Sequence, residues 1–145
     1  MKLTTKGRYA IIAMADLVLH SRTEPVSLKE ITKRQSISLS YLEQLFSKLK
    51  ESDLVQSVRG PGGGYQLGRE SSEISLLDII TAVDEKIDQT QCGGAMNCNK
   101  DHPCLTHYIW TELNEKINQY MRDITLSDIA TREDVKSIMI FRESK

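Results

Sequence analysis

The sequence predicts a mainly α fold: a winged helix-turn-helix domain with a two-stranded wing, then a ligand-rich loop and one long helix. Three patterns support this prediction. Two short segments with helix-capping signals follow each other closely, a glycine-rich turn joins two short strands directly after them, and a long amphipathic stripe fills much of the C-terminal half. With 145 residues, 39% of them hydrophobic and 27% charged, the chain can form one ordinary globular domain with an appendage.

Three helical segments in the first third of the chain predict the helix-turn-helix. The first, residues 6–19, carries apolar side chains at helical spacing. The second, residues 27–34, and the third, residues 40–51, each begin with the capping-box pattern, which in the third is Ser40 followed by Glu43. Two short capped helices with a tight connection are typical of this motif. The predicted buried faces of the first and third helices consist of Ala10, Ala13, Met14, Leu17, Leu42, Leu45, Phe46 and Leu49.

A β-hairpin directly after the third helix predicts the wing. Residues 54–58 and 65–67 have the pattern of short strands, and the sequence RGPGGG between them tolerates positive φ at several positions. This glycine run lacks the Gly-Lys-Ser/Thr ending of a phosphate-binding loop, so a hairpin turn explains it better. A helix capped by Ser75 and ending near Val83 completes the predicted domain.

The N-terminal part of the third helix is the predicted DNA-reading surface. Glutamine pairs well with adenine and glutamate accepts from cytosine N4, so Gln44 and Glu43 are candidates for base contacts. Glu43 has a second interpretation, a capping-box bond to Ser40, and serine or tyrosine at this place can contact phosphate alone. At the wing, Arg59 either enters a minor groove or contacts phosphate. The predicted DNA-contacting residues are Ser38, Ser40, Tyr41, Glu43, Gln44, Arg59 and Gly60.

Charge is unevenly distributed along the chain, although the formal net charge is only −1. Residues 1–69 contain 11 Lys and Arg against 6 Asp and Glu, whereas residues 70–145 contain 8 against 14. A basic half indicates contact with a polyanion, and a chance fluctuation explains the charge pattern, taken alone, equally well.

The most informative chemical feature is one loop that holds every cysteine of the chain. Cys92, Cys98, Cys104 and His107 are separated by five, five and two residues, within a polar stretch rich in turn formers. A structural zinc site fits the residue types but prefers gaps of about two to four residues. An iron–sulfur cluster spreads its ligands further apart, and a metal-free thiol switch leaves His107 without a role. His102 competes as the fourth ligand, but His107 lies one helical turn after Cys104.

A helix over about residues 105–123 provides the long stripe, in which apolar side chains recur in steps of three or four. Little other apolar sequence in the C-terminal half can cover it, so we expect the same helix of a second subunit to do so in a two-fold dimer. The alternative is packing against the first helix. A short helix capped by Thr125 follows, and the tail after Arg132 is expected to be partly disordered or loosely packed. The stripe consists of Ile109, Leu113, Ile117, Tyr120 and Ile124.

Catalysis and membrane insertion are both disfavoured by the sequence. The histidines have no obvious serine or carboxylate partner, and the carboxylates are scattered along helices, so we do not expect an enzyme. No apolar run is long enough to span a membrane, no signal-peptide pattern begins the chain, and an odd cysteine count suits a reducing compartment. We therefore expect a cytoplasmic protein.

Five motifs, in order, resemble those of one known family. They are MKLTTKGRYA at the start, ISLSYLEQLF from residue 37, VRGPGGGY from residue 58, AVDE from residue 82 and CLTH from residue 104. Over residues 1–130 the chain is similar to the IscR family of iron–sulfur cluster regulators, which are bacterial winged-helix transcription factors. Related nitric-oxide sensors use an N-terminal acidic ligand, and the sequence Lys6-Gly7-Arg8 disfavours that variant here.

The resemblance implies a homodimer that binds a two-fold symmetric double-stranded DNA operator and carries one 2Fe–2S cluster per subunit, received from the iron–sulfur assembly machinery. It implies cluster ligation by Cys92, Cys98, Cys104 and His107, and a regulator that senses cluster status and mainly represses genes for cluster assembly. A zinc-stabilised regulator without redox sensing is the alternative. The expected division is a DNA-binding domain (1–83), a linker and cluster-binding loop (84–107), a long dimerisation helix region (108–132) and a flexible tail (133–145).

Overall fold

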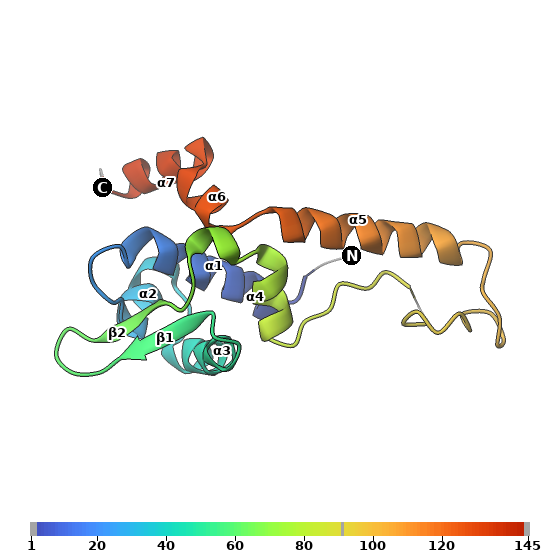
Figure 1. The fold of residues 1–145 in the computed structure, drawn as a ribbon, viewed down its shortest axis with the longest axis horizontal. Helices are drawn as coiled ribbons and strands as arrows, with labels where there is room; N and C mark the ends of the chain where they lie inside the picture. Colours follow the sequence, from blue (N-terminus) through green and yellow to red (C-terminus); the bar gives the residue numbers. More distant parts are fainter. Residues whose placement is uncertain (1–2, 91, 144–145) are drawn as a thin grey trace.

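The computed structural model describes residues 3–90 and 92–143. It shows a winged domain from which one long helix and its preceding loop extend to one side (Figure 1). The elements in chain order are α1 (Thr5–His20), α2 (Leu28–Gln35), α3 (Leu39–Glu51), β1 (Val55–Val58), β2 (Gly64–Leu67), the 3₁₀ turn η1 (Ser71–Glu73), α4 (Leu76–Ala82), α5 (His107–Asp123), α6 (Leu126–Thr131) and α7 (Glu133–Glu143). The mainly α fold with its two-stranded antiparallel wing confirms the predicted fold class.

The winged domain has one apolar core, which α1 to α4 and the hairpin surround. All eight side chains predicted to be buried in α1 and α3 are in it, each at most 3% exposed. In the wing, β1 and β2 pair in antiparallel register, with Val55 opposite Leu67. The ring of Tyr65 in β2 packs on Phe46 of α3, with 4.9 Å between the ring centroids. This contact fixes the position of the wing relative to α3.

The chain returns to this core after α5. Leu126, the first residue of α6, is fully buried in the same apolar cluster. Its backbone N–H donates to the carbonyl of Ile74 at 2.9 Å, and the N–H of Leu76 donates to the carbonyl of Ile124 at 2.9 Å. The winged domain is therefore completed by a segment from the far side of α5.

The N-cap of helix α3 lies two residues before the one that the sequence pattern predicts. Ser38 is its N-cap, and the hydroxyl of Ser38 accepts a hydrogen bond from the N–H of Tyr41 at 3.3 Å. The expected capping box of Ser40 and Glu43 is therefore wrong, because both residues lie inside the helix.

Burial explains this choice of start. With Ser38 as N-cap, Ile37 and Leu42 occupy the two positions of a hydrophobic staple, and both are buried. A start at Ser40 would place the polar side chain of Gln44 in the second of these positions. The cost of exposing an apolar pair outweighs the gain from a second capping bond.

Helix α5 points away from the winged domain (Figure 1). The rest of the described chain covers its apolar stripe only in part: Ile109 and Tyr120 are exposed, whereas Leu113, Ile117 and Ile124 are half-buried. Tyr108, Ile109 and Tyr120 are each at least 59% exposed. Within the winged domain the helix packs against α4. An open stripe on a projecting helix is the arrangement expected of a surface that meets a second subunit.

The tail differs in part from its expectation. Residues Glu133–Glu143 form helix α7, which the sequence reasoning missed because the segment has no strong apolar periodicity. Its side chains Ile138 and Ile140 are 54% and 66% exposed, so this helix packs loosely, as expected. None of the described helices combines the length and the apolar character needed to cross a membrane.

Candidate metal centre and nucleic-acid interface

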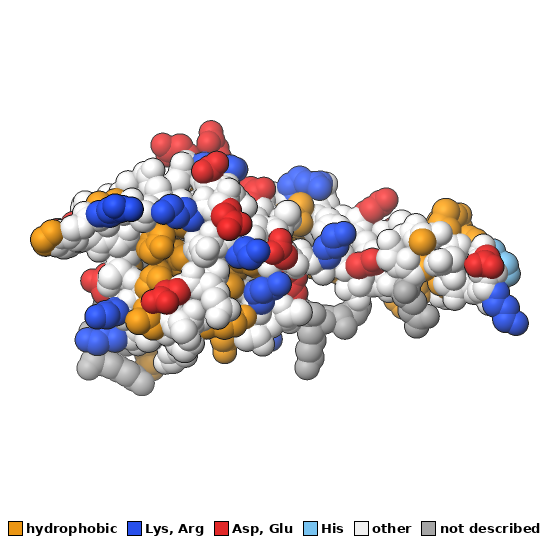
Figure 2. Space-filling view, turned by 90° about the horizontal axis from the view of Figure 1, so that it is seen from below, with side chains coloured by type: hydrophobic (Ala, Val, Ile, Leu, Met, Phe, Trp, Pro, Cys, Tyr) orange, Lys and Arg blue, Asp and Glu red, His pale blue; other side chains and the backbone are white. Residues whose placement is uncertain are grey.

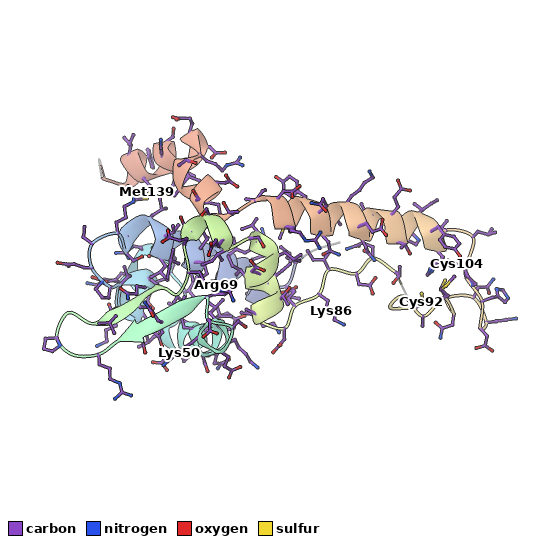
Figure 3. The ribbon with its side chains drawn as sticks, in the orientation of Figure 1. Lys50, Arg69, Lys86, Cys92, Cys104 and Met139 are labelled. Atoms are coloured by element: carbon purple, nitrogen blue, oxygen red, sulfur yellow. The ribbon has the colours of Figure 1, made fainter. Side chains whose placement is uncertain are left out.

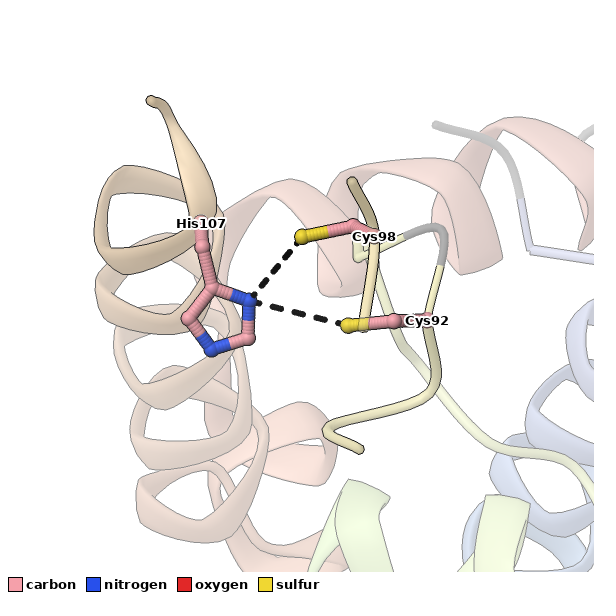
Figure 4. A group of neighbouring side chains, drawn as sticks. All are labelled: Cys92, Cys98 and His107. Atoms are coloured by element: carbon pink, nitrogen blue, oxygen red, sulfur yellow. Dashed lines mark hydrogen bonds between the residues drawn. The ribbon is translucent and has the colours of Figure 1, made fainter. Parts of the chain in front are cut away.

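Two cysteines and one histidine converge at the outer end of α5. Cys92 and Cys98 come from the loop, and His107 is the first residue of the helix (Figures 3 and 4). The imidazole Nδ1 lies 3.6 Å from the Sγ of Cys92 and 3.6 Å from the Sγ of Cys98. His107 is only 4% exposed, whereas both cysteines are partly open to solvent. The three ligand atoms all lie within 4.8 Å of one another.

These distances suit metal coordination. With a metal–sulfur bond of about 2.3 Å and a metal–nitrogen bond of about 2.0 Å, sulfur and nitrogen ligands of one tetrahedral ion lie roughly 3.6 Å apart. The observed spacing equals this edge, and thiolates with an imidazole are the donor set that zinc and iron–sulfur clusters share. The residues present therefore fit a soft metal ion or a cluster.

The fourth predicted ligand lies next to this group. Cys104 is outside the set of mutually close ligand atoms, and its Sγ lies 3.7 Å from the hydroxyl of Thr106. Its backbone N–H donates to the Sγ of Cys98 at 3.0 Å, which ties it to the site. His102, the competing histidine, is exposed, and its Nδ1 lies 3.4 Å from the carbonyl of Pro103. The compact group therefore includes His107 and not His102.

The electrostatics of the loop favour thiolates. Partial burial opposes ionisation of Cys92, but backbone N–H groups of the loop, together with Cys98 and His107, lower the pKa of its thiol to about 6. Contacts with Cys98 and Thr106 also lower the pKa of Cys104. The N–H of Cys104 favours the Cys98 thiolate, yet burial and the two neighbouring thiols raise the pKa of Cys98. Because the thiolate is the form that binds metal, Cys92 is prepared for coordination at neutral pH.

The loop reaches this geometry through several tight turns. Gly93 and Gly94 have φ values of 63° and 88°, a left-handed conformation that glycine adopts without strain. Asn99 and His102 exchange two backbone hydrogen bonds, of 2.9 and 3.1 Å. The chain between Cys98 and Cys104 thus folds back on itself, which brings the two cysteines close.

The second candidate site is the exposed face of α3. Ser38, Ser40, Glu43 and Gln44 are exposed on it, whereas Tyr41 is partly buried. Glu43 is not engaged in a capping box, and within residues 3–90 and 92–143 it makes no ion pair. Its carboxylate is therefore available to an outside donor.

The wing contributes two further predicted residues. Arg59 and Gly60 are exposed in the turn between β1 and β2, and Gly60 has a φ of 98°. The N–H of Gly63 donates to the carbonyl of Gly60 at 2.9 Å, which closes the turn. On the face seen in Figure 2, basic side chains lie around the winged domain with acidic ones between them.

Sequence reasoning missed one exposed residue of the α3 face. Ser47 is exposed and follows Glu43 and Gln44 by four and three residues, so it shares their side of the helix. Helical spacing alone could have identified it. Lys50 is also close, but its Nζ donates to the hydroxyl of Ser57 in β1 at 3.1 Å (Figure 3), which directs it toward the wing.

Comparison with known proteins finds transcriptional regulators that match nearly the whole chain. The HTH-type transcriptional regulator IscR of Serratia proteamaculans (strain 568) is 53% identical over 135 residues, which cover 93% of this chain and 82% of that protein. The regulator of the same name from Sodalis glossinidius (strain morsitans) is 51% identical over 139 residues, covering 96% of this chain and 84% of that protein.

Solved structures give the same result. CymR (YrzC), the global cysteine regulator of B. subtilis, matches with a TM-score of 0.79 at 33% identity, covering 90% of this chain and 97% of that chain. T. potens IscR matches with a TM-score of 0.71 at 34% identity, covering 100% of this chain and 89% of that chain. The model of the Rrf2 family, described as an iron-dependent transcriptional regulator, matches residues 3–132. This chain therefore belongs to the Rrf2 family of iron-dependent transcriptional regulators.

Proposed function

We propose that this DNA-binding transcriptional regulator senses iron–sulfur cluster status through a 2Fe–2S cluster and mainly represses genes for cluster assembly. The observation that carries the proposal is the convergence of Cys92, Cys98 and His107 at the start of α5, with Cys104 attached to Cys98 by a backbone hydrogen bond. The protein acts in the cytoplasm as a homodimer and receives its cluster from the iron–sulfur assembly machinery.

The ligand set favours a cluster for a reason of space. Two bridged irons need four terminal ligands spread wider than the corners of one tetrahedral ion. Cys104 already lies outside the compact group, and the loop would have to spread the ligands so that each iron receives two of Cys92, Cys98, Cys104 and His107. An exposed loop with several turns can make this adjustment, whereas His107 is held by its helix. The cluster would supply redox and iron sensitivity to the loop.

Zinc remains a second candidate, because the sulfur–nitrogen separations of 3.6 Å match a single tetrahedral ion. In that case the loop would be a structural element, and the chain would be a winged-helix regulator without redox sensing.

On the DNA side, α3 enters a major groove and the wing contacts the adjacent backbone or minor groove. Gln44 and Glu43 read base edges, Ser38 and Ser40 contact phosphate or bases, and Arg59 with Gly60 lies along the wing turn. Tyr41 is half-buried and packs on Tyr9, so it offers less surface to DNA than its exposed neighbours on α3. Two copies joined through α5 present two such faces to a two-fold symmetric operator.

The deciding experiment combines metal analysis with DNA binding on one sample. Protein purified without oxygen is examined by visible absorption and assayed for iron, sulfide and zinc. The variants His107→Ala and His102→Ala form a matched pair, because both remove an imidazole from the same loop. We expect about two irons and two sulfides per chain in the wild type and in His102→Ala, and loss of the visible absorption in His107→Ala.

If the protein contains stoichiometric zinc and no iron even after anaerobic cluster reconstitution, the cluster proposal is wrong and the zinc-stabilised regulator takes its place. Equal loss of absorption in both histidine variants would contradict the ligand assignment.

Binding to short duplex DNA is then followed by fluorescence anisotropy at several salt concentrations. A steep fall of affinity with salt is expected of phosphate contacts, and a flat dependence would contradict the DNA interface.

A further inference from the structure

A short acidic segment, residues 84–89, connects the winged domain to the Cys/His loop, and we call it the strap. Figure 3 shows it passing from the end of α4 toward Cys92 along the side of α5. Near its outer end the strap is fastened to α5, where one amide side chain holds two of its residues. Asn114 donates to the carboxylate of Asp88 at 2.9 Å and accepts from the N–H of Gln89 at 2.6 Å. These two bonds hold the outer end of the strap on α5, the helix that begins with His107.

At its inner end the strap is fastened to the first turn of α1. Glu85 is 9% exposed, and its carboxylate accepts hydrogen bonds from the N–H of Thr4, at 2.8 Å, and from the hydroxyl of Thr4. Thr4 is the N-cap of α1, so this carboxylate completes the end of the helix from outside. Two residues that are 81 positions apart in the sequence are joined by this contact.

Glycine at residue 7 makes room for the carboxylate. A Cβ at this position would lie 2.9 Å from the Cδ of Glu85 and closer still to its Oε2. Gly7 is not among the residues with positive φ, so its backbone is open to any side chain. The close approach of Glu85, rather than the backbone conformation, is what requires glycine here.

The start of α1 is in turn packed on the helix proposed to read DNA. The rings of Tyr9 and Tyr41 meet edge to face, with 5.8 Å between their centroids. Asp84 also reaches α3 directly, through an ion pair with Lys48 at 3.0 Å, but both side chains are about half exposed or more, so water screens this pair. A second route from the strap to α3 passes through Glu85, the first turn of α1 and the ring contact of Tyr9 with Tyr41.

We propose that Glu85 is a positioning residue that couples the metal state of the Cys/His loop to the orientation of α3, by holding the strap against the N-terminus of α1. This inference rests on the proposed function. A change at Cys92 alters the path of the strap, the strap carries Glu85, and Glu85 carries the first turn of α1 with it.

The test measures how much metal loading changes DNA affinity, expressed as the ratio of two dissociation constants. The dissociation constant for one short labelled duplex, selected from a random pool with metal-loaded wild-type protein, is determined for the loaded protein and for chelator-treated protein. The variants are Glu85→Ala, Gly7→Ala and their combination. Gly7→Ala leaves the carboxylate chemically intact but displaces it, and the higher helix propensity of alanine offsets part of the stability that is lost with the contact. Lys86→Ala is the matched control, because it alters the strap at an exposed side chain.

If wild-type coupling lies in the usual range of about 5–150-fold, each single variant should bring the ratio close to one. The metal content of Gly7→Ala should stay near wild type, and its melting temperature should be no lower than that of Glu85→Ala. The double variant should lose no more than either single one, because both act on one contact. A wild-type ratio in Gly7→Ala, or an equal loss in Lys86→Ala, would overturn the inference while leaving the proposed function standing. A ratio of one in the wild type itself would overturn both.

Discussion

Replacing Leu126 with alanine tests whether α6 is part of the DNA-binding core. Leu126 is 0% exposed, and substitutions of this kind cost about 2–5 kcal/mol, depending on how far the cavity collapses. The backbone hydrogen bond from Leu126 to Ile74 fixes the cavity wall on one side, so we expect the upper half of the range, about 4 kcal/mol. For a chain of this size that loss lowers the melting temperature by roughly 8–16 °C.

The assay is urea unfolding, followed by far-UV circular dichroism and by the fluorescence of Trp110, the single tryptophan of the chain. Ile138→Ala, in the exposed face of α7, is the control and should change the free energy of unfolding by less than about 0.5 kcal/mol. A loss below about 1 kcal/mol in Leu126→Ala would refute the reasoning, because α6 would then be only loosely attached to the winged domain.

Three further predictions follow from the described contacts. Burial opposes the charge of Glu85, but hydrogen bonds from Thr4 and Gly7 hold its pKa below the ordinary 4.5. Its ionised form therefore stabilises the fold fully above about pH 4.5, and this contribution is lost as the pH falls through the lowered pKa. The difference in melting temperature between wild type and Glu85→Gln should accordingly shrink in acid. A constant difference from pH 7 to pH 3 would speak against this. Arg59→Ala should weaken binding to all duplexes similarly and reduce the slope of log affinity against log salt by about one, and a change confined to one sequence would instead indicate base reading. Ile109→Glu, at a residue 59% exposed in α5, should yield a folded monomer in sedimentation analysis, and an unchanged dimer would remove α5 from the interface.

The parts of the fold that sequence could predict are those governed by local spacing. The buried faces of α1 and α3 followed from helical periodicity, and the wing followed from its glycine turn. The start of α3 was missed because Ser40, with Glu43 three residues later, has the stronger capping signal, whereas the burial of Ile37 favours Ser38. That burial is a tertiary contact, which capping rules do not contain.

The candidate site was predicted to a similar extent and for a similar reason. Residue type and spacing identified the Cys/His loop, and the preference for His107 over His102 agrees with the observed group. The position of Cys104 outside the compact group could not be foreseen, because it depends on the three-dimensional path of the loop and not on spacing along the sequence. The contact of Glu85 with Thr4 was likewise invisible, since nothing local marks two residues so far apart as neighbours.

The burial of Leu126 also changes what kind of module the sensing part is. Ala82, just before the strap, and Leu126, just after α5, both lie in the same apolar core. The Cys/His loop and α5 therefore form an insertion within the DNA-binding domain. A fragment cut after Ala82 would uncover the apolar surface beneath Leu126 and leave the carbonyl of Ile74 without its donor. An insertion whose two ends lie in the same core can, in contrast, be replaced by another segment without a change to that core. Evolution can therefore adapt such a protein to new signals while the DNA-binding domain stays the same.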